Sequence, residues 1–313
     1  MNNIYNHKIY LLKKFENNLY KQKYSKIRTL VRHKDEKFKS YLLNYNLIFS
    51  KSGGKRKYGF FRKNEKKFPL ITIVTVVLND KKNIENTIKS ILKQDYPNLE
   101  YIIVDGSSLD GTLSIIKKYE KFIDYWISKK DDGIFDAQNI GLQLSSGKYV
   151  SFVNSGDYLA KNAINIIYKY ILRYPNKDAV AGTVIKDKIY SGYCPERIQY
   201  NFNVIPSFVG FFLKLSCVKK IGLFKNKYKY LSDWDFLYKF VVLNNFFAIP
   251  TKKSEIISIF DLNGFSSKIG FFKNLFQEIR LRFNNKQNIF FLLAIIAARP
   301  ILKFKNIIYR KYQ

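Results

Sequence analysis

Four clusters rich in Asp, Asn and Ser follow apolar segments of this chain, and their side chains are the best suited to chemistry. They are Asn79–Asp80, Asp105–Ser108, Lys129–Asp132 and Asn154–Asp157. Each cluster comes after a short run with the length and composition of a buried strand. The carboxyl ends of parallel strands lie at one edge of a sheet, and open α/β sheets bind their ligands there. Carboxylate and amide oxygens at that edge could hold a divalent cation and a phosphate.

Asp157 has two interpretations when it is taken alone. It follows the predicted strand Lys148–Asn154, so its carboxylate could bind a metal ion at the strand end. Alternatively it caps a helix predicted over Tyr158–Tyr174, which is the commoner role for an isolated Asp. The convergence of the other clusters on the same edge favours a ligand-binding site.

The elements that must position these clusters alternate between strand and helix. The predicted strands are Leu70–Leu78, Leu99–Val104, Phe122–Ile127 and Lys148–Asn154, and the predicted helices are Lys81–Lys93, Thr112–Glu120 and Ile134–Ser145. The first strand is a continuous run of β-branched and aliphatic residues, typical of a strand buried on both faces. The alternation predicts an α/β fold, with a mostly parallel sheet flanked by helices.

Composition excludes several classes of protein. The chain has 313 residues and is 47% hydrophobic, which excludes a disordered protein and predicts a large core. Its two cysteines, Cys194 and Cys217, and its two histidines are too few for a disulfide framework or a zinc site. This composition favours a reducing, cytoplasmic compartment.

The net charge of +31 is concentrated in the two ends of the chain. Residues 1–68 carry a net charge of +15 and residues 263–313 one of +9, which leaves +7 for the rest. Basic ends indicate an acidic partner, either nucleic acid or anionic lipid. No nucleic-acid-binding signature is present, so no nucleic-acid partner is expected. The N-terminus lacks a signal peptide, and Ile289–Leu302 is too short to span a bilayer.

Residues 69–160 resemble the family 2 glycosyltransferases, which are inverting enzymes of the GT-A fold. The matching segments are ITIVTVVLND, SILKQDYPNLEYIIVDGSSLDGT, DYWISKKDDGIFDAQNIG and SGKYVSFVNSGDYL, and weaker matches (IGLF, SDWDF, GFS) continue to residue 266. The resemblance implies a GT-A domain over residues 69–266, with a nucleotide-sugar half (69–160) and an acceptor half (161–266). It leaves residues 1–68 as a basic N-terminal extension, helical with a linker at Lys51–Lys67. Residues 267–313 remain as basic, amphipathic C-terminal helices.

The resemblance also implies an activity and the residues that perform it. A sugar would pass from a nucleotide-diphosphate donor, expected to be a UDP-sugar, to an acceptor hydroxyl with inversion at the anomeric carbon. Asp157 would bind a divalent cation, Mg²⁺ or Mn²⁺, that bridges the diphosphate oxygens. The donor-binding positions implied by the resemblance are Thr75, Asn79, Asp105, Asp131, Gly133, Asp136, Asn139 and Asn154.

Asp233, in the segment LSDWDF, matches the general base, which takes the proton of the acceptor hydroxyl. Asp235 is two residues further and would point to a different side of a helix. The alternative is that Ser232 or Asp233 only caps that helix.

The chain departs from the family pattern at three places. Asp105-Gly106 stands where relatives often have two adjacent acids. The sequence from Asn154 to Asp157 stands where they often have DxDD, so a single carboxylate remains for the metal. The Q-x-x-R-W signature of processive synthases is absent, so one addition per encounter is expected, as in non-processive enzymes of bacterial surface-polysaccharide or glycolipid synthesis.

The C-terminal segments Ile269–Phe283 and Ile289–Tyr309 are predicted to be amphipathic helices. They could pack on the catalytic domain or lie at a membrane surface. The second is flanked by Lys303, Lys305, Arg310 and Lys311, which favours an anionic membrane surface. A peripheral protein on the inner face of the membrane would suit a saccharide or lipid-linked saccharide acceptor. The alternatives are a basic nucleic-acid-binding module and a non-catalytic subunit that tethers a partner at the membrane.

Overall fold

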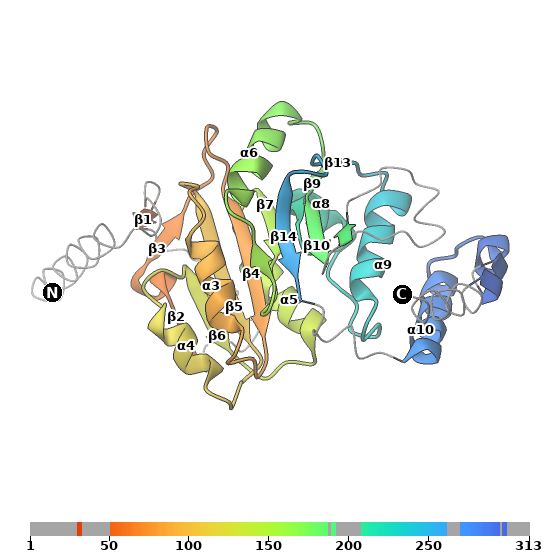
Figure 1. Ribbon diagram of the computed structural model, residues 1–313, viewed down its shortest axis with the longest axis horizontal. Coiled ribbons are helices and arrows are strands. Elements are labelled where there is room, and N and C mark those ends of the chain that lie inside the picture. The colour runs from red at the N-terminus through yellow and green to blue at the C-terminus, as the bar shows by residue number, and fades with distance from the viewer. Residues whose placement is uncertain are drawn as a thin grey trace, which may run out of the picture.

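An eight-stranded sheet forms the centre of the structure, which is a computed structural model that describes residues 30–32, 51–186, 189–191, 208–261, 270–294 and 296–298 (Figure 1). The strand order is β13-β9-β12-β7-β4-β5-β6-β2, and only β12 and β2 run antiparallel to their neighbours. The predicted α/β class with a mostly parallel sheet is therefore confirmed. The strands are β2 (Lys51–Gly53), β4 (Ile71–Val77), β5 (Leu99–Asp105), β6 (Tyr125–Ser128), β7 (Tyr149–Phe152), β9 (Ala179–Ala181), β12 (Phe211–Lys214) and β13 (Ala248–Pro250).

A second sheet of four strands, in the order β11-β10-β14-β8, stands beside the acceptor half of the main sheet. β10 pairs in parallel with β14, and β14 pairs antiparallel with β8. A short pair, β1 with β3, lies near the other end of the molecule. These strands are β1 (Leu30–Arg32), β3 (Phe60–Arg62), β8 (Tyr158–Leu159), β10 (Thr183–Lys186), β11 (Ile189–Ser191) and β14 (Ile256–Phe260).

Helices cover both faces of the main sheet, so β4 is buried on both sides, as its sequence predicts. Val74 and Val76 pack with α5 and the acceptor half, whereas Ile71, Ile73 and Val77 pack with α3, α4 and α6. The helices are α3 (Ile84–Leu92), α4 (Thr112–Lys118), α5 (Ile134–Leu144), α6 (Ala163–Arg173), α8 (Leu215–Ile221), α9 (Ser232–Tyr238) with a π-helical continuation at Lys239–Leu243, and α10 (Phe271–Asn284).

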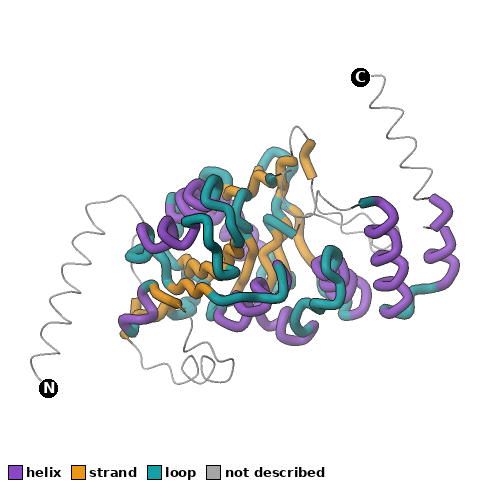
Figure 2. The backbone as a smooth tube through the Cα atoms, turned by 90° about the horizontal axis from the view of Figure 1, so that it is seen from below, coloured by secondary structure: helices purple, strands orange, loops and turns teal. Residues whose placement is uncertain are grey.

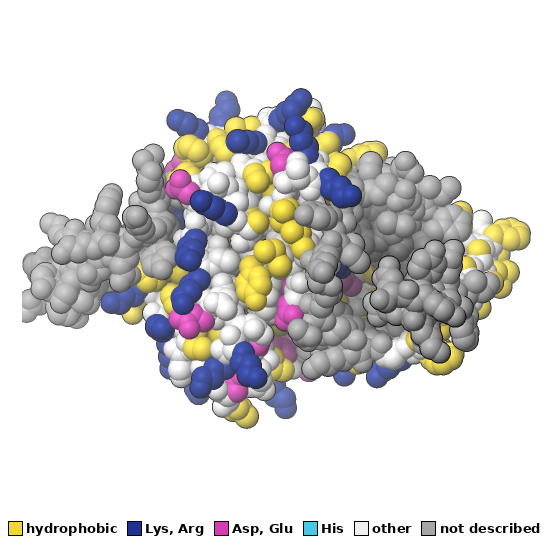
Figure 3. Space-filling view, in the orientation of Figure 1, with side chains coloured by type: hydrophobic (Ala, Val, Ile, Leu, Met, Phe, Trp, Pro, Cys, Tyr) yellow, Lys and Arg dark blue, Asp and Glu magenta, His cyan; other side chains and the backbone are white. Residues whose placement is uncertain are grey.

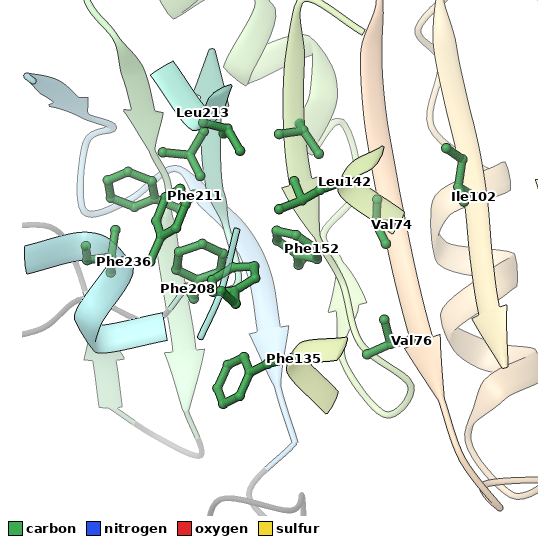
Figure 4. Packing of buried hydrophobic residues seen from close by; sticks show 14 of the residues in the cluster. Val74, Val76, Ile102, Phe135, Leu142, Phe152, Phe208, Phe211, Leu213 and Phe236 are labelled. Carbon is green, nitrogen blue, oxygen red and sulfur yellow. The ribbon is translucent and has the colours of Figure 1, made fainter. Parts of the chain in front are cut away.

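An aromatic cluster joins the two halves of the domain (Figure 4). The ring of Phe208 lies 5.5 Å from that of Phe152 on β7 and 5.8 Å from that of Phe236 on α9. Phe224 contacts both Phe152 and Phe236, at 5.7 and 5.0 Å. Aromatic pairs at such distances stabilise beyond the area they bury. The cluster therefore fixes α9 relative to the strand that precedes Asp157.

The prediction of a linker at Lys51–Lys67 is wrong. β2 extends the main sheet by pairing with β6, and a 3-10 helix at Lys55–Tyr58 leads into β3. The side chains of Arg56 and Arg62 are buried, where they form ion pairs with Glu100 and Asp124. The basic composition suggested solvent exposure, but buried carboxylates on the neighbouring strands neutralise these cations.

The helix predicted over Tyr158–Tyr174 begins later than expected. The two-residue strand β8 comes first, and α6 starts at Ala163, after Asn162 in a left-handed conformation (φ 61°). Asp157 therefore does not cap a helix. Its backbone carbonyl instead accepts a hydrogen bond from Thr87 Oγ1 of α3, at 2.9 Å.

The C-terminal helix α10 packs on α9 through its polar side. Arg282 and Glu278 are buried, and the Arg282 guanidinium lies 4.4 Å from the centre of the Trp234 ring. Asn285 donates a 2.7 Å hydrogen bond to Asp235. As a consequence, the aromatic side of α10 faces outward.

Helical turns follow α10 at residues 289–294 and 296–298, and Figure 2 shows them beside α10 at one end of the molecule. Within the ranges described, no helix combines the length and apolarity that crossing a membrane requires. The GFS segment, the basic residues from Arg299 onward and most of the predicted N-terminal helix lie outside these ranges. Leu30–Arg32, which was predicted to be helical, forms strand β1 instead.

Removal of the Asp124 charge should destabilise the fold because this carboxylate neutralises two buried cations. It accepts a 2.8 Å hydrogen bond from Arg62, lies 3.7 Å from Lys55, and accepts another from the backbone N–H of Tyr101. Breaking one partner of a buried ion pair costs about 3–5 kcal/mol. We expect Asp124→Asn to lower the free energy of unfolding in urea by that amount.

A matched control removes an exposed ion pair. Lys118, whose side chain is 66% exposed, pairs with Glu85 at 3.1 Å. Lys118→Gln should change the unfolding free energy by less than about 0.5 kcal/mol. Equal effects of the two variants would show that residues 51–62 are not an integral part of the folded domain.

Candidate active site

The carboxyl ends of the parallel strands meet at one edge of the main sheet. β4 continues to β5 and then β6 on one side, and the chain then crosses to β7 on the other side of β4. The gap between β4 and β7 is therefore the point where the strand order reverses, which is where open α/β sheets bind ligands. The predicted clusters at Asn79, Asp105, Asp131 and Asn154 all follow strands that end at this edge.

Asp105 ends β5 and is fully buried. Its carboxylate accepts hydrogen bonds from Ser128 Oγ on β6, at 2.6 Å, and from the backbone N–H of Ser108, at 3.2 Å. These bonds hold the carboxylate at the sheet edge.

Gly106 allows the Asp131 carboxylate to lie beside Asp105. A Cβ at position 106 would be 2.8 Å from Asp131 Oδ2, so the Asp131 side chain would have to shift to admit one. The Asp131 carboxylate thus lies close to the backbone of Gly106, at the position where relatives often have a second acid.

The loop that leads into α5 gathers further polar groups. The Gly133 N–H donates to Asp131 Oδ1 at 3.0 Å, and Gly133 has φ 114°, a conformation that favours glycine. Burial raises the pKa of Asp131, and the charges of Asp136 and Asp105 raise it further. No atom of the described chain lies within 4 Å of a Cβ built on Gly133, so the space beside the backbone is open. This loop has the room and the donors for a ligand to approach its backbone.

Two predicted donor-binding residues have structural roles instead. Thr75 is fully buried, and its hydroxyl donates to the Val153 carbonyl at 2.7 Å and accepts from Tyr101. Asn139 is buried and pairs with the backbone of Phe224, donating at 2.9 Å and accepting at 2.8 Å. Thr75 therefore joins β4 to β7, and Asn139 joins α5 to the acceptor half. Both side chains make these hydrogen bonds within the protein, as the buried carboxylate of Asp105 also does.

The remaining predicted residues lie at the rim of the edge. Asn79 has φ 50° and accepts a 2.8 Å hydrogen bond from the backbone N–H of Leu109, which holds the loop after β5. Asp136, in the first turn of α5, accepts from the backbone N–H of Asp132 at 3.2 Å. Asn154 accepts from Gln138 Nε2 at 3.3 Å.

Asp157 is almost completely buried. Hydrogen bonds join it to α3 through Thr87, to the end of β7 through the Asn154 carbonyl, and to the residue that follows β14. Oδ1 accepts a 2.9 Å hydrogen bond from the backbone N–H of Asp261, which follows β14. Burial, followed by the nearby charge of Asp261, raises the pKa of Asp157 to about 7. A buried carboxylate beside a second acid is a position that a cation would stabilise.

Asp233 lies on the acceptor half, in the first turn of α9, and is partly exposed. Burial raises its pKa to about 6, while the charge of Lys186 opposes this shift. Asp235 is buried instead, where it pairs with Lys239 and accepts from Asn285. The two acids thus lie in different surroundings, as their spacing predicts, and Asp233 is the more exposed of the two. The N-cap residue of α9 is Leu231, which makes no side-chain capping bond, whereas Asp233 Oδ1 accepts a 2.8 Å hydrogen bond from the backbone N–H of Trp234 in the first turn.

Asp157 and Asp261 fit a divalent cation that is shared with a phosphate. Both supply hard oxygen atoms, and the Asp261 carboxylate lies within 2.9 Å of a Cβ built on Gly156, which shows how closely it approaches the loop of Asp157. Among the residues that the structure describes, no group of three or more His, Cys, Asp and Glu gathers around one point. One or two carboxylates, completed by substrate phosphates and water, are the usual arrangement for Mg²⁺.

Two residues of this site were not predicted. Asp261 directly follows the apolar run Ile256–Phe260, so the strand-end rule that identified the other acids could have found it. Lys186 ends β10 and lies near both Asp157 and Asp233. It carried no signal, because it is one of 55 Lys and Arg residues in the chain.

Comparisons with known sequences agree with this geometry. A family model described as Glycosyl transferase family 2 matches residues 72–247. An uncharacterized glycosyltransferase of Rickettsia prowazekii is 30% identical over 187 residues, which are 55% of this chain and 58% of that protein. The putative teichuronic acid biosynthesis glycosyltransferase TuaG of Bacillus subtilis is 36% identical over 99 residues, 31% of this chain and 39% of that protein. The chain thus matches less than two thirds of the length of these curated relatives.

Solved structures share the fold. The S. aureus protein TarS (residues 1–349), in complex with UDP, aligns with a TM-score of 0.53 and 19% identity over 68% of this chain and 64% of that one. The mannosyltransferase PcManGT from Pyrobaculum calidifontis, in complex with GDP-Man and Mn²⁺, aligns with a TM-score of 0.55 and 16% identity over 80% of this chain and 72% of that one.

Proposed function

The chain belongs to glycosyl transferase family 2, whose model matches more than half of its length, and from this premise we propose that it transfers a sugar from a nucleotide-diphosphate donor to an acceptor hydroxyl. The expected donor is a UDP-sugar, and the expected outcome is inversion at the anomeric carbon. One observation carries the proposal. Asp105, Asp131 and Asp157 follow strands that end at the edge where the strand order reverses, and the charge of Lys186 acts on both Asp157 and Asp233, which begins α9 in the other half of the domain.

The nucleoside would bind at the ends of β5 and β6. Asp105 is the residue that we assign to the uracil or the ribose, and Asp131 lies next to it across Gly106. The open backbone at Gly133 leaves space for the diphosphate, and Asn79, Asp136 and Asn154 complete the rim. Thr75 and Asn139 hold β4, β7 and α5 in place beneath this surface through their hydrogen bonds to Val153 and Phe224.

Asp157, with Asp261 beside it, would hold Mg²⁺ or Mn²⁺. A cation bound there supplies Lewis acidity and charge neutralisation to the diphosphate oxygens. The raised pKa of Asp157, caused first by burial, supports this role because a carboxylate without a counter-charge is costly to bury. Mn²⁺ in the related PcManGT structure is in line with the same type of cation.

Asp233 would act as the general base. As the acceptor oxygen attacks the anomeric carbon, its proton passes to the Asp233 carboxylate, and the bond from that carbon to the diphosphate oxygen breaks with its electron pair on the diphosphate. Attack from the face opposite to the leaving group inverts the configuration. Asp235 cannot replace Asp233 in this role, because Lys239 and Asn285 occupy its two oxygens.

The acceptor would be a saccharide or a lipid-linked saccharide presented at a membrane. Exposed apolar side chains gather at the end of the molecule formed by α10 and the turns after it (Figure 3). We call this the apolar end, and it consists of Phe272, Phe276, Phe283, Ile289, Phe290, Leu293 and Ile296, which are between 38% and 80% exposed. Lys273, Arg280 and Lys286 are exposed between them. Such a surface suits the interface of an anionic membrane, on its cytoplasmic side, in the synthesis of surface polysaccharides or glycolipids.

Donor binding should depend on both the metal and Asp157. Calorimetry with UDP, with and without Mn²⁺, should show tighter binding with Mn²⁺ for the wild type. Asp157→Asn should lose that gain while it retains the binding measured without metal. Equal affinity in all four combinations would remove the metal role from Asp157.

The pH dependence of transfer should report Asp233. Its carboxyl has a pKa of about 6, raised by burial, and a base works only when ionised, so kcat/KM should fall as the pH drops below about 6. Asp233→Asn should bind UDP normally, transfer about 10²–10⁴-fold more slowly, and lose this acidic limb. A variant with near wild-type rate would place the base elsewhere.

Vesicle binding should depend on the apolar end. We expect the protein to pellet with vesicles of anionic lipid and much less with neutral ones. Replacement of Phe272, Phe276 and Phe283 by Ser should abolish pelleting and leave UDP binding intact. Each basic residue at such a surface contributes about 1 kcal/mol, so Arg280→Glu with Lys286→Glu should weaken binding by more than tenfold.

Leu109 provides the control for vesicle binding, because it is 93% exposed in the loop that leads into α4, and α4 lies far from α10 in Figure 1. Leu109→Ser should pellet like the wild type. If the triple Phe variant also pellets like the wild type, then the apolar end does not bind membranes.

A further inference from the structure

Lys186 lies in one row with the proposed metal-binding residues of the small sheet. In the pairing of β10 with β14, Lys186 is opposite Phe260, and in the pairing of β14 with β8, Ile259 is opposite Tyr158. The next position in that antiparallel register places Phe260 opposite Asp157. Neighbouring strands are about 4.8 Å apart, so the lysine is two strands away from Asp157, a distance that its long side chain can largely span.

The side chain of Lys186 turns toward that row. Its Nζ lies 4.6 Å from the centre of the Phe260 ring. Phe260 directly precedes Asp261, whose backbone N–H donates to Asp157. The ammonium group therefore reaches the same end of the small sheet as these two acids.

Lys186 is the cation that influences both halves of the site. Its positive charge lowers the pKa of Asp157 on the donor side and that of Asp233 on the acceptor side. Burial lowers the pKa of Lys186 itself, while the charges of Asp233 and Asp157 oppose that shift. Within the described part of the chain, neither acid forms a salt bridge with it. Lys186 is therefore a half-buried cation at the end of β10 whose charge acts on both acids.

The charge balance of the site calls for such a cation. Asp157 and Asp233 each bring one negative charge when ionised, and the diphosphate of a donor adds at least two more. A single divalent cation would neutralise at most half of them. When the sugar leaves, further negative charge develops on the diphosphate, and fixed positive groups stabilise it best in a site that is already organised.

We propose that Lys186 binds the diphosphate of the donor, between Asp157 and Asp233, and stabilises the charge on the departing nucleotide. This inference rests on the proposed function, and it adds a residue to which the family resemblance assigned no role. It also explains how a site with a single carboxylate at the Asn154–Asp157 turn can function, because Lys186 and the metal ion would together neutralise the negative charge of the diphosphate.

The test compares Lys186→Met, which keeps the stem over Phe260 but removes the charge, with Lys186→Arg, which keeps the charge. Calorimetry measures UDP and UMP binding, with Mn²⁺ and with a chelator. A hydrogen bond to a charged group is worth about 1.5–3 kcal/mol, so Lys186→Met should weaken UDP binding about 10- to 150-fold. UMP binding should change by less than threefold, because UMP lacks the second phosphate. Lys186→Arg should recover most of the UDP affinity.

Lys214 is the matched control. It is also a half-buried lysine at a strand end, but it lies at the opposite edge of the main sheet and donates to the Pro175 carbonyl at 2.9 Å. Lys214→Met should bind UDP like the wild type.

The possible failures are distinguishable. If Lys186→Met binds UDP as tightly as the wild type and transfers at the wild-type rate, the inference is overturned. Equal losses for UDP and UMP would overturn it as well, since they would mean that Lys186 acts through the fold and not on the diphosphate. If the wild-type protein binds no nucleoside diphosphate at all, the proposed function itself fails.

Discussion

β4 pairs in parallel with β5 over seven residues on one side and with β7 over four residues on the other. These backbone hydrogen bonds fix the register of the three strands, and the register fixes where each strand ends. Side chains that are far apart in the sequence, such as Asn79, Asp105 and Asn154, meet at one edge because of this pairing. Thr75 strengthens it from within by bonding its hydroxyl to the backbone that continues β7. The aromatic cluster around Phe208 then brings α9 against the same strands, so the acceptor half depends on this pairing too.

The two edges of the main sheet differ in whether their buried charges have partners of opposite charge. At the amino edge, Arg56 pairs with Glu100, and Thr72 and Ser146 complete the hydrogen bonds of that carboxylate. Buried charges there are matched within the protein, which stabilises the fold and leaves nothing to bind. At the carboxyl edge, Asp157 is buried, and within the described part of the chain it forms no salt bridge. A buried negative charge without a counter-ion is costly for a protein alone, and it is acceptable where a cation or a substrate supplies the balance.

Sequence reasoning located the strands and their terminal acids because both follow from local patterns. The apolar run before Asp105 predicts a buried strand, and the parallel arrangement then predicts the common edge. These local patterns do not indicate whether a polar side chain near that edge faces a ligand or another part of the protein. Asn139 and Thr75 have the right types and positions, but their hydrogen bonds go to Phe224 and Val153, which only the tertiary fold brings near. The same limit applies to Arg56 and Arg62, whose buried partners lie more than 40 residues away in the sequence.

The packing of α10 on α9 has an optical consequence. The chain contains two tryptophans, and they lie in very different places. Trp126 is buried in the main sheet on β6, whereas Trp234 follows the proposed base directly and lies under the guanidinium of Arg282. A cation so close to the indole shifts its emission, so the fluorescence of Trp234 is sensitive to how α10 sits on α9. In a protein with Trp126 replaced by Phe, a single intrinsic chromophore would report events at the acceptor side, with no label attached.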